Sequence, residues 1–195
     1  MKKSFLLPLA LLGASVLPGA CDAADTPKIL VAYFSRTGEN YNVGYIRKGN
    51  TEIVAEILAE KTGADLFRIE PVKKYQDNYK EAVETSRREL AQKARPALTA
   101  AVPDFDSYDV IFLGYPIWCG DMPMPVYTFL ESYDFSGKTI IPFCTHEGSG
   151  LAGTPGKIKN TVSGVNVTRG LSVYGTAAQQ NRTEAERLIN EFLRS

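Results

Sequence analysis

Short apolar runs alternate with longer amphipathic segments along the chain. Between Lys28 and Ser35, which bound residues 28–35, the chain forms a continuous run of apolar, aromatic and β-branched residues, which is typical of a strand covered on both faces of a parallel sheet. Four more short apolar runs follow along the chain, and the polar residues and glycine at 168–170 interrupt the last of them. The predicted strands are residues 28–35, 66–70, 110–114, 139–144 and 165–174.

Helical patterns separate these strands. One apolar helix face consists of Ile53, Val54, Ile57 and Leu58, and another of Ala185, Leu188, Ile189 and Phe192. Residues 79–94 predict a polar helix whose charges alternate in sign, which indicates a solvated face. Strands that alternate with helices predict an α/β fold, a doubly wound, five-stranded parallel sheet in a three-layer α/β/α arrangement.

The N-terminus predicts export. Two lysines precede the apolar run 5–18, which is too short to span a bilayer as a lasting helix, so residues 1–20 are interpreted as a signal peptide. The small residues before Cys21 resemble a bacterial lipoprotein cleavage site, where Cys21 would carry the lipid; ordinary cleavage near residues 23–24, with Cys21 an exposed tail residue, stays open. We expect a tether over 21–27, one domain over 28–195, and a periplasmic or lipid-anchored protein that meets a membrane only through that lipid.

The charges are balanced. The chain has 22 basic and 22 acidic residues, and loss of the two lysines in residues 1–20 leaves a net charge of −2. This excludes a nucleic-acid partner recognised through a basic surface. Only Cys119, Cys144 and a single histidine could offer soft metal ligands in the folded part, so no metal site is expected. Whether the two cysteines pair stays open.

A loop that follows the first strand carries phosphate-binding chemistry. It contains Ser35, Arg36, Thr37 and Gly38, then eleven residues, 39–49, and then Asn50 and Thr51 at the start of a helix. Hydroxyl groups, a glycine that permits close approach, and amides at a helix start are the groups that hold a phosphate. The alternative is a polar turn before an Asn-capped helix, which accounts for Asn50 and Thr51 alone.

A loop after the third strand carries the only tryptophan. Its order is Pro116, Ile117, Trp118, Cys119 and Gly120. An aromatic side chain in a loop held by proline can stack on a planar heterocycle, and ligands of open α/β sheets bind beyond the carboxyl ends of the strands. The alternative places Trp118 in the core.

The loop after the fourth strand contains His146, Glu147, Gly148, Ser149 and Gly150. Its glycines and serine let backbone amides approach the edge of a ligand ring. His146 is the candidate catalytic residue, because histidine titrates near neutral pH and can donate or relay a proton. The alternative is that His146 caps its own loop through a backbone hydrogen bond.

Read without the eleven-residue insert, the first loop is S-R-T-G-N-T, and together with Y-P-I-W it resembles the flavodoxins, over nearly all of residues 28–195. Y-P-I-W followed by Met-Pro is similar to the sequences of an exported bacterial branch of that family. The resemblance implies FMN, not FAD, held by the residues of the three loops.

The resemblance also implies a redox function. The protein would transfer electrons to a redox partner protein, or reduce a small conjugated acceptor such as a quinone, with NAD(P)H as a possible donor that would share the flavin cleft. The alternative is a flavin-free ligand-binding or structural module on the same fold. Two features depart from flavodoxins: the insert 39–49, and the lack of a strongly acidic surface, which would make the flavin easier to reduce. The insert is interpreted as a lid or a site for an anionic partner, or else as a tolerated surface loop.

Overall fold

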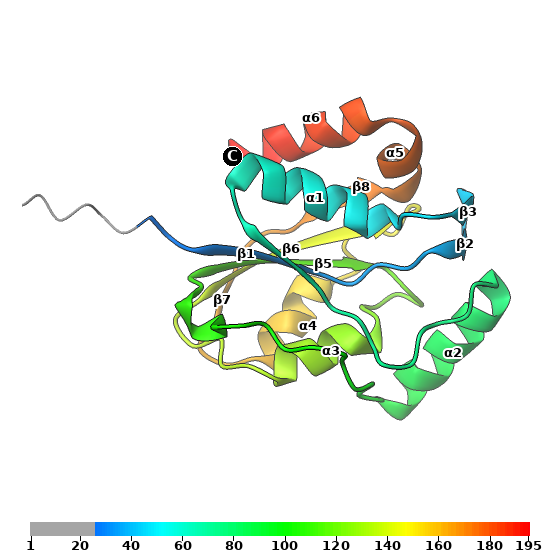
Figure 1. Ribbon diagram of the computed structural model, residues 1–195, viewed down its shortest axis with the longest axis horizontal. Helices are drawn as coiled ribbons and strands as arrows, with labels where there is room; N and C mark the ends of the chain where they lie inside the picture. Colours follow the sequence, from blue (N-terminus) through cyan, green and yellow to red (C-terminus); the bar gives the residue numbers. More distant parts are fainter. Residues whose placement is uncertain (1–25) are drawn as a thin grey trace, which may run out of the picture.

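The computed structural model describes residues 26–195 and shows a parallel sheet between two helical layers (Figure 1). The strand order is β4-β1-β5-β6-β7, and β8 also pairs with β6. The strands are β1 Ile29–Tyr33, β4 Asp65–Arg68, β5 Val110–Pro116, β6 Thr139–His146, β7 Asn166–Val167 and β8 Leu171–Tyr174. The predicted doubly wound α/β fold is confirmed. The expected fifth strand is two short strands, because residues 168–170 interrupt it between β7 and β8.

Helices cover both faces of the sheet. In Figure 1, α1, α5 and α6 lie on one face, and α3 and α4 on the other. The helices are α1 Asn50–Thr62, α2 Tyr79–Gln92, α3 Met124–Glu131, α4 Thr154–Thr161, α5 Gly175–Gln180 and α6 Arg182–Leu193, with a 3₁₀ turn, η1, over Phe105–Ser107. The polar helix expected at residues 79–94 is α2, which lies beyond the carboxyl end of the sheet, near the insert.

Each strand buries side chains on both faces. On β1, Leu30 and Ala32 pack in the cluster that includes α3 and α4, whereas Val31 and Tyr33 pack in the cluster that includes α1 and α6. Successive side chains of a strand point to opposite faces, so a continuous apolar run serves both cores. Burial of one large apolar side chain contributes about 1.5 to 3 kcal/mol, and these two layers fix the loops at the ends of β1, β5 and β6.

The insert forms a separate antiparallel hairpin. Its strands are β2 Gly38–Asn40 and β3 Gly44–Ile46, and they pair only with each other. Figure 1 shows the hairpin beyond the carboxyl ends of the parallel strands. The insert therefore adds a two-stranded element to the ligand end of the fold.

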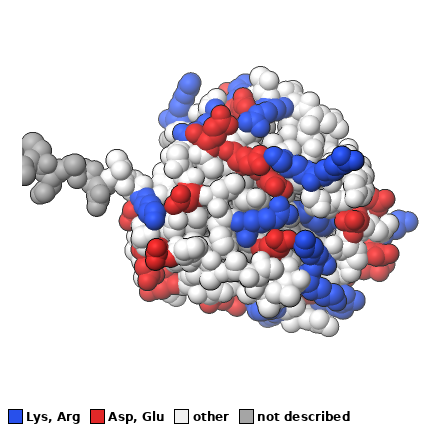
Figure 2. Space-filling view, in the orientation of Figure 1, with Lys and Arg blue, Asp and Glu red and all other residues white. Residues whose placement is uncertain are grey.

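The signal peptide over residues 1–20, the lipidation of Cys21 and most of the tether over 21–27 lie outside the described residues. Within residues 26–195, no helix combines the length and the apolar character that crossing a bilayer requires. Figure 2 shows basic and acidic side chains interspersed on one face of the molecule, as the balanced composition predicts.

Candidate functional site

The three predicted loops meet at one end of the sheet. From β1 the chain passes to β4 on one side and then to β5 on the other, so the winding direction changes between β1 and β5. Ligands of open α/β sheets bind at such a switch point, beyond the carboxyl ends of the strands. The loops after β1, β5 and β6 surround this place.

The first loop and the start of α1 form a cradle. The Ser35 hydroxyl accepts a hydrogen bond from the Glu52 amide at 3.1 Å. A Cβ atom on Gly49 would lie 2.1 Å from Ser35 Oγ, so only glycine permits this approach. Gly49 caps α1 without a side-chain hydrogen bond, which leaves other first-turn amides without a competing side chain. First-turn amides that no side chain occupies attract a phosphate group.

The side-chain oxygen of Asn50 lacks a hydrogen-bond donor within the described residues. Its Oδ1 atom is buried and has no partner among residues 26–195. A Cβ atom on Gly175 would lie 2.2 Å from Asn50 Nδ2, so the amide is packed tightly against the start of α5. Buried polar atoms are nearly always paired, so this oxygen indicates a place where a ligand hydroxyl donates.

The Thr51 hydroxyl forms a hydrogen bond inside the protein. Its hydroxyl is 2.7 Å from the Thr145 hydroxyl, and both side chains are buried. The pair connects α1 to β6 beneath the cradle. Thr37 is half-buried and, with Ser35, lines a cavity on the side of β4.

Arg36 is a clamp in the first loop. Its buried guanidinium donates to the carbonyl oxygen of Gln76 at 2.7 Å, to that of Asp77 at 3.3 Å, and to that of Glu39. Burial lowers the pKa of Arg36, and the nearby acidic groups, Asp77 first, oppose the shift. Gly38 belongs to the same junction, because a Cβ atom there would lie 2.8 Å from the Asp77 carbonyl oxygen.

The hairpin connects α2 to the loop after β6. The Glu39 carboxylate accepts from the Tyr79 amide at 3.1 Å, at the start of α2, and the rings of Tyr41 and Tyr79 stack with centroids 6.2 Å apart. At the hairpin turn, Asn42 Nδ2 donates to Glu147 at 3.3 Å. The insert is thus held at both ends across the mouth of the site.

Trp118 begins a tight turn. Its backbone amide and carbonyl pair with those of Asp121 at 2.8 and 2.9 Å, and Cys119 and Gly120 between them have φ values of 51° and 76°. Positive φ at both central residues defines a type I′ turn, which favours glycine. The Trp118 ring is half-buried and meets the Phe34 ring edge-on at 5.3 Å. Part of Trp118 therefore packs against the core, as the alternative interpretation expects.

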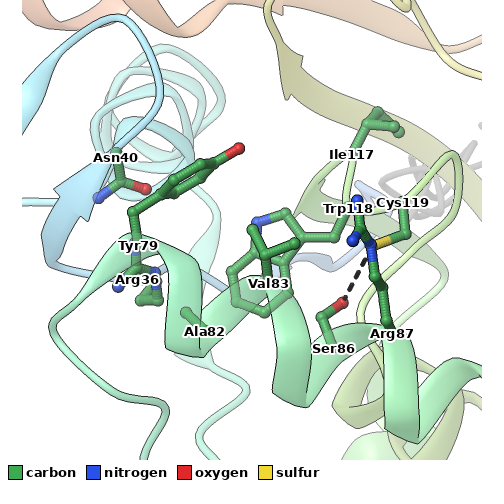
Figure 3. Close-up of a pocket in the computed structure, with 10 residues that line it drawn as sticks. All are labelled: Arg36, Asn40, Tyr79, Ala82, Val83, Ser86, Arg87, Ile117, Trp118 and Cys119. Atoms are coloured by element: carbon green, nitrogen blue, oxygen red, sulfur yellow. Dashed lines mark hydrogen bonds between the residues drawn. The ribbon is translucent and has the colours of Figure 1, made fainter.

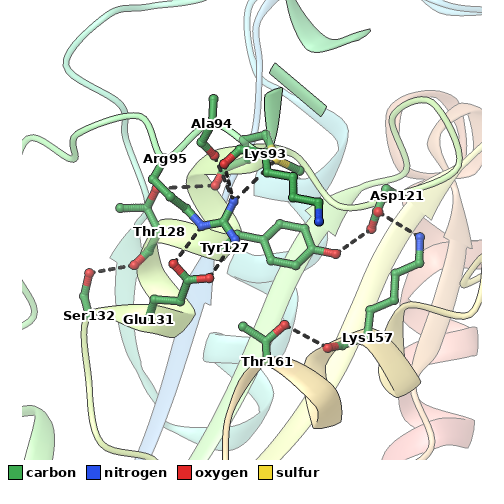
Figure 4. A network of polar contacts seen from close by, with 11 residues as sticks. Lys93, Ala94, Arg95, Asp121, Tyr127, Thr128, Glu131, Ser132, Lys157 and Thr161 are labelled. Atoms are coloured by element: carbon green, nitrogen blue, oxygen red, sulfur yellow. Dashed lines mark hydrogen bonds and ion pairs between the residues drawn. The ribbon is translucent and has the colours of Figure 1, made fainter. Parts of the chain in front are cut away.

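A polar network holds this turn in place (Figure 4). The Asp121 carboxylate is buried, accepts from the Tyr127 hydroxyl at 3.0 Å and pairs with Lys157 at 2.8 Å. Arg95 lies over the Tyr127 ring and pairs with Glu131 at 2.7 Å. Burial, reinforced by Asp121, raises the pKa of Tyr127, so its hydroxyl stays protonated as a donor.

His146 lies buried at the end of β6. Its Nδ1 atom accepts from the Gly148 amide at 2.9 Å, which is the loop cap that the alternative interpretation expects. Burial lowers the pKa of His146, and Glu147 opposes the shift. The ring is therefore neutral near pH 7, and because Nδ1 accepts, Nε2 carries the proton.

The neighbouring residues complete the third loop. Glu147 also accepts from the Thr176 amide at 2.8 Å, and positive φ values at Gly148 and Gly150 place the turn around exposed Ser149. Cys144 and Cys119 are free thiols, one buried and one exposed. Burial raises the pKa of the Cys144 thiol to about 12.

Two adjoining cavities occupy the site. The first has a volume of about 130 Å³. The three loops, the hairpin and the first residue of α2 contribute to its lining: Asn40, Tyr41, Asn50, Tyr79, Pro116, Ile117, Trp118, Thr145, His146 and Glu147. The second, of about 180 Å³, lies between α2 and the Trp118 turn (Figure 3). They share the side chains of Asn40, Tyr79, Ile117 and Trp118.

The sequence interpretation missed the contribution of α2 and the hairpin. Tyr79 belongs to a helix that was expected only to be solvated, and Asn40 to an insert without a predicted structure. The tyrosine at the start of a polar helix was the available signal. Among residues 26–195, no cluster of three or more potential metal-binding side chains occurs.

Comparison with known proteins identifies the family. The model of the family described as Flavodoxin matches residues 28–187. A solved protein from Bacteroides uniformis, described as a candidate flavoprotein, is 31% identical with a TM-score of 0.68 and aligns over 84% of this chain and 98% of its own. A similarly described protein from Bacteroides eggerthii is 30% identical with a TM-score of 0.67, over 85% and 98%.

A more distant structure shares the fold. The flavoprotein of Lactobacillus acidophilus, solved in complex with FMN, is 18% identical with a TM-score of 0.60, over 81% of this chain and 99% of its own. No curated protein matches the chain. The family match and the two Bacteroides structures confirm the expectation drawn from the loops: the chain belongs to the flavodoxin family, whose cofactor is FMN.

Proposed function

We propose that the protein holds FMN between the loops after β1, β5 and β6 and uses it to reduce a small conjugated acceptor such as a quinone. The observation that carries this proposal is the pair of adjoining cavities that share Trp118. An electron carrier needs only an exposed cofactor edge for its partner protein. A second cavity beside the cofactor residues gives room to a small molecule.

The residues at the first cavity fit FMN. The first turn of α1 is capped by glycine, and its amides suit the terminal phosphate. The unpaired Oδ1 atom of Asn50 can accept from a ribityl hydroxyl. Ile117 and the half-buried ring of Trp118 offer apolar contact to the isoalloxazine ring, and backbone amides of the third loop can approach its edge.

Bound FMN supplies one- and two-electron redox chemistry. Conversion of a quinone into its hydroquinone takes two electrons and two protons, and a nicotinamide nucleotide or a reduced partner protein is the electron source that we propose. The neutral His146 carries its N–H at Nε2 and lines the first cavity, where it can donate a hydrogen bond to a bound ring while solvent supplies the two protons. Asn40 and Tyr41 of the hairpin line the same cavity, together with Trp118.

The test is a measurement of cofactor and turnover on one sample. The flavin released from the purified protein is identified by chromatography, and NAD(P)H oxidation is followed with and without benzoquinone. We expect FMN and quinone-dependent oxidation. Bound FMN without reduction of any small acceptor would favour the carrier function, and a protein that binds no flavin would favour the flavin-free module.

We also propose that the protein acts in the cell envelope of a bacterium. The apolar run 5–18 and the small residues before Cys21 support export and lipidation. Labelling of cells with a palmitate analogue tests the anchor: label on the wild type but not on the Cys21→Ala variant is expected. An unlabelled, fully soluble periplasmic protein would favour ordinary cleavage.

A further inference from the structure

The cavity between α2 and the Trp118 turn has an apolar and aromatic wall. Ala82 and Val83 contribute from α2, and Ile117 and Trp118 from the loop after β5 (Figure 3). Its volume is about 180 Å³. An aliphatic cavity of about 150 Å³ accommodates benzene, so this one has room for a single substituted ring.

The charged side chains of this cavity have one sign. Arg36 and Arg87 line it, and no aspartate or glutamate does. Arg36 is bonded to carbonyl oxygens and forms no ion pair within residues 26–195, although the Asp77 and Glu39 side chains lie near it. Arg87, on the exposed side of α2, forms no hydrogen bond or ion pair with any residue in the range 26–195. Two cationic groups around a concave surface of low dielectric constant attract an anion.

The structure also places a hydroxyl donor beside Arg87. Ser86 is buried, and within residues 26–195 its hydroxyl has a single partner, the Cys119 thiol, which donates to it at 3.9 Å (Figure 3). A thiol is a weak partner for a hydroxyl. Ser86 is thus free to exchange this contact for a stronger acceptor, as a carboxylate oxygen would be.

We propose that this cavity is the acceptor site and selects small planar rings that carry a carboxylate. The ring packs against Trp118 and Val83, and the carboxylate pairs with Arg87 in the two-pronged geometry that guanidinium groups favour. This inference rests on the proposed function, because the acceptor, a carboxylated quinone, gains its two electrons from the cofactor across Trp118. Two protons, taken up from solvent, go to the quinone oxygens, and a nicotinamide nucleotide or reduced protein gives up the two electrons in turn.

The single tryptophan provides a direct readout. The indole N–H group of Trp118 gives one signal in a ¹⁵N NMR spectrum, because the chain has no other tryptophan. Benzoate and benzamide are matched probes that differ mainly in charge. We expect both to shift the signal, and benzoate to bind about tenfold more tightly, as one charge-assisted contact predicts.

Two neighbouring arginines provide matched variants. Arg88 is also exposed on α2, but it lines a different cavity, with residues 72–76. The Arg87→Gln variant is expected to lose the preference for benzoate, and the Arg88→Gln variant to keep it. Equal binding of the two probes by the wild type, or an equal loss in both variants, would overturn the inference.

The flavin content of the same samples separates the two proposals. If FMN binds and the preference for benzoate is absent, the acceptor site is refuted and the proposed function stands. If the preference is present in a protein that cannot bind FMN, the role as acceptor site is refuted together with the proposed function. Both a preference for benzoate and bound FMN are required to support the inference.

Discussion

Replacement of Asn50 by alanine should lower the affinity for the cofactor without lowering stability. The Oδ1 atom of Asn50 is buried and has no hydrogen-bond partner among residues 26–195. A buried acceptor left unpaired costs about 1 to 3 kcal/mol, most of which the alanine variant recovers. Part of this gain is offset by lost packing against Gly175. We therefore expect the free energy of unfolding of the cofactor-free protein to stay constant or to rise by about 1 kcal/mol.

The same change should weaken FMN binding. A hydrogen bond to a neutral acceptor contributes about 0.5 to 1.5 kcal/mol, so the dissociation constant should rise up to about tenfold. Urea unfolding of the cofactor-free protein and quenching of FMN fluorescence on titration measure the two quantities.

Asn181 provides the control for this experiment. It caps α6 through a hydrogen bond from the Glu184 amide at 3.2 Å, and its replacement by alanine should lower the free energy of unfolding by about 1 kcal/mol without changing FMN affinity. If the Asn50→Ala variant behaves like the Asn181→Ala variant, Asn50 is a structural residue and the reasoning is refuted.

Three further outcomes are expected. The Trp118→Ala variant should bind FMN more weakly by about 1 to 2 kcal/mol, the scale of a lost aromatic contact; an unchanged dissociation constant would make Trp118 a core residue only. His146 has a lowered pKa, so as the pH falls below the ordinary value of 6.5 the unfolded chain binds a proton before the folded one does, and the free energy of unfolding should decrease. The His146→Gln variant should flatten this dependence in urea midpoints measured between about pH 7 and pH 5. Deletion of residues 39–49 joins Gly38 to Asn50, so that a glycine again precedes α1, and it should leave FMN bound but change turnover; loss of FMN would show that the insert belongs to the cradle.

The sequence predicted the fold because its signals are local. A strand buried on both faces must be apolar throughout, and the runs that became β1, β5 and β6 could be identified from composition alone. The break within the last strand was equally visible, although its consequence was not. Whether residues 168–170 would form a bulge or divide the strand depends on the pairing offered by β6, which is a property of the assembled sheet.

The candidate site was predictable only in part. Loop residues near strand ends could be placed together, since parallel strands share their carboxyl edge. The direction of each side chain could not. Thr51 and Ser35 are both hydroxyl residues of the cradle motif, yet the Thr51 hydroxyl bonds to Thr145, 94 positions away, and the Ser35 hydroxyl to a nearby amide of α1. Such choices are made by tertiary contacts that no local pattern records.

The role of Arg36 in the first loop depends on the insert and could not be predicted from the loop sequence. An arginine inside a phosphate loop suggests an ion pair with the phosphate. The guanidinium of Arg36 instead donates to three backbone carbonyl oxygens, and these hydrogen bonds connect the loop to the hairpin and to the segment before α2. The buried guanidinium places a positive charge at the cavities it lines, and the nearby Asp77 and Glu39 carboxylates offset that charge in part. The hairpin therefore does more than cover the site: its Glu39 carbonyl helps to hold a positive charge, which would favour the phosphate of FMN and the anionic acceptor that we propose.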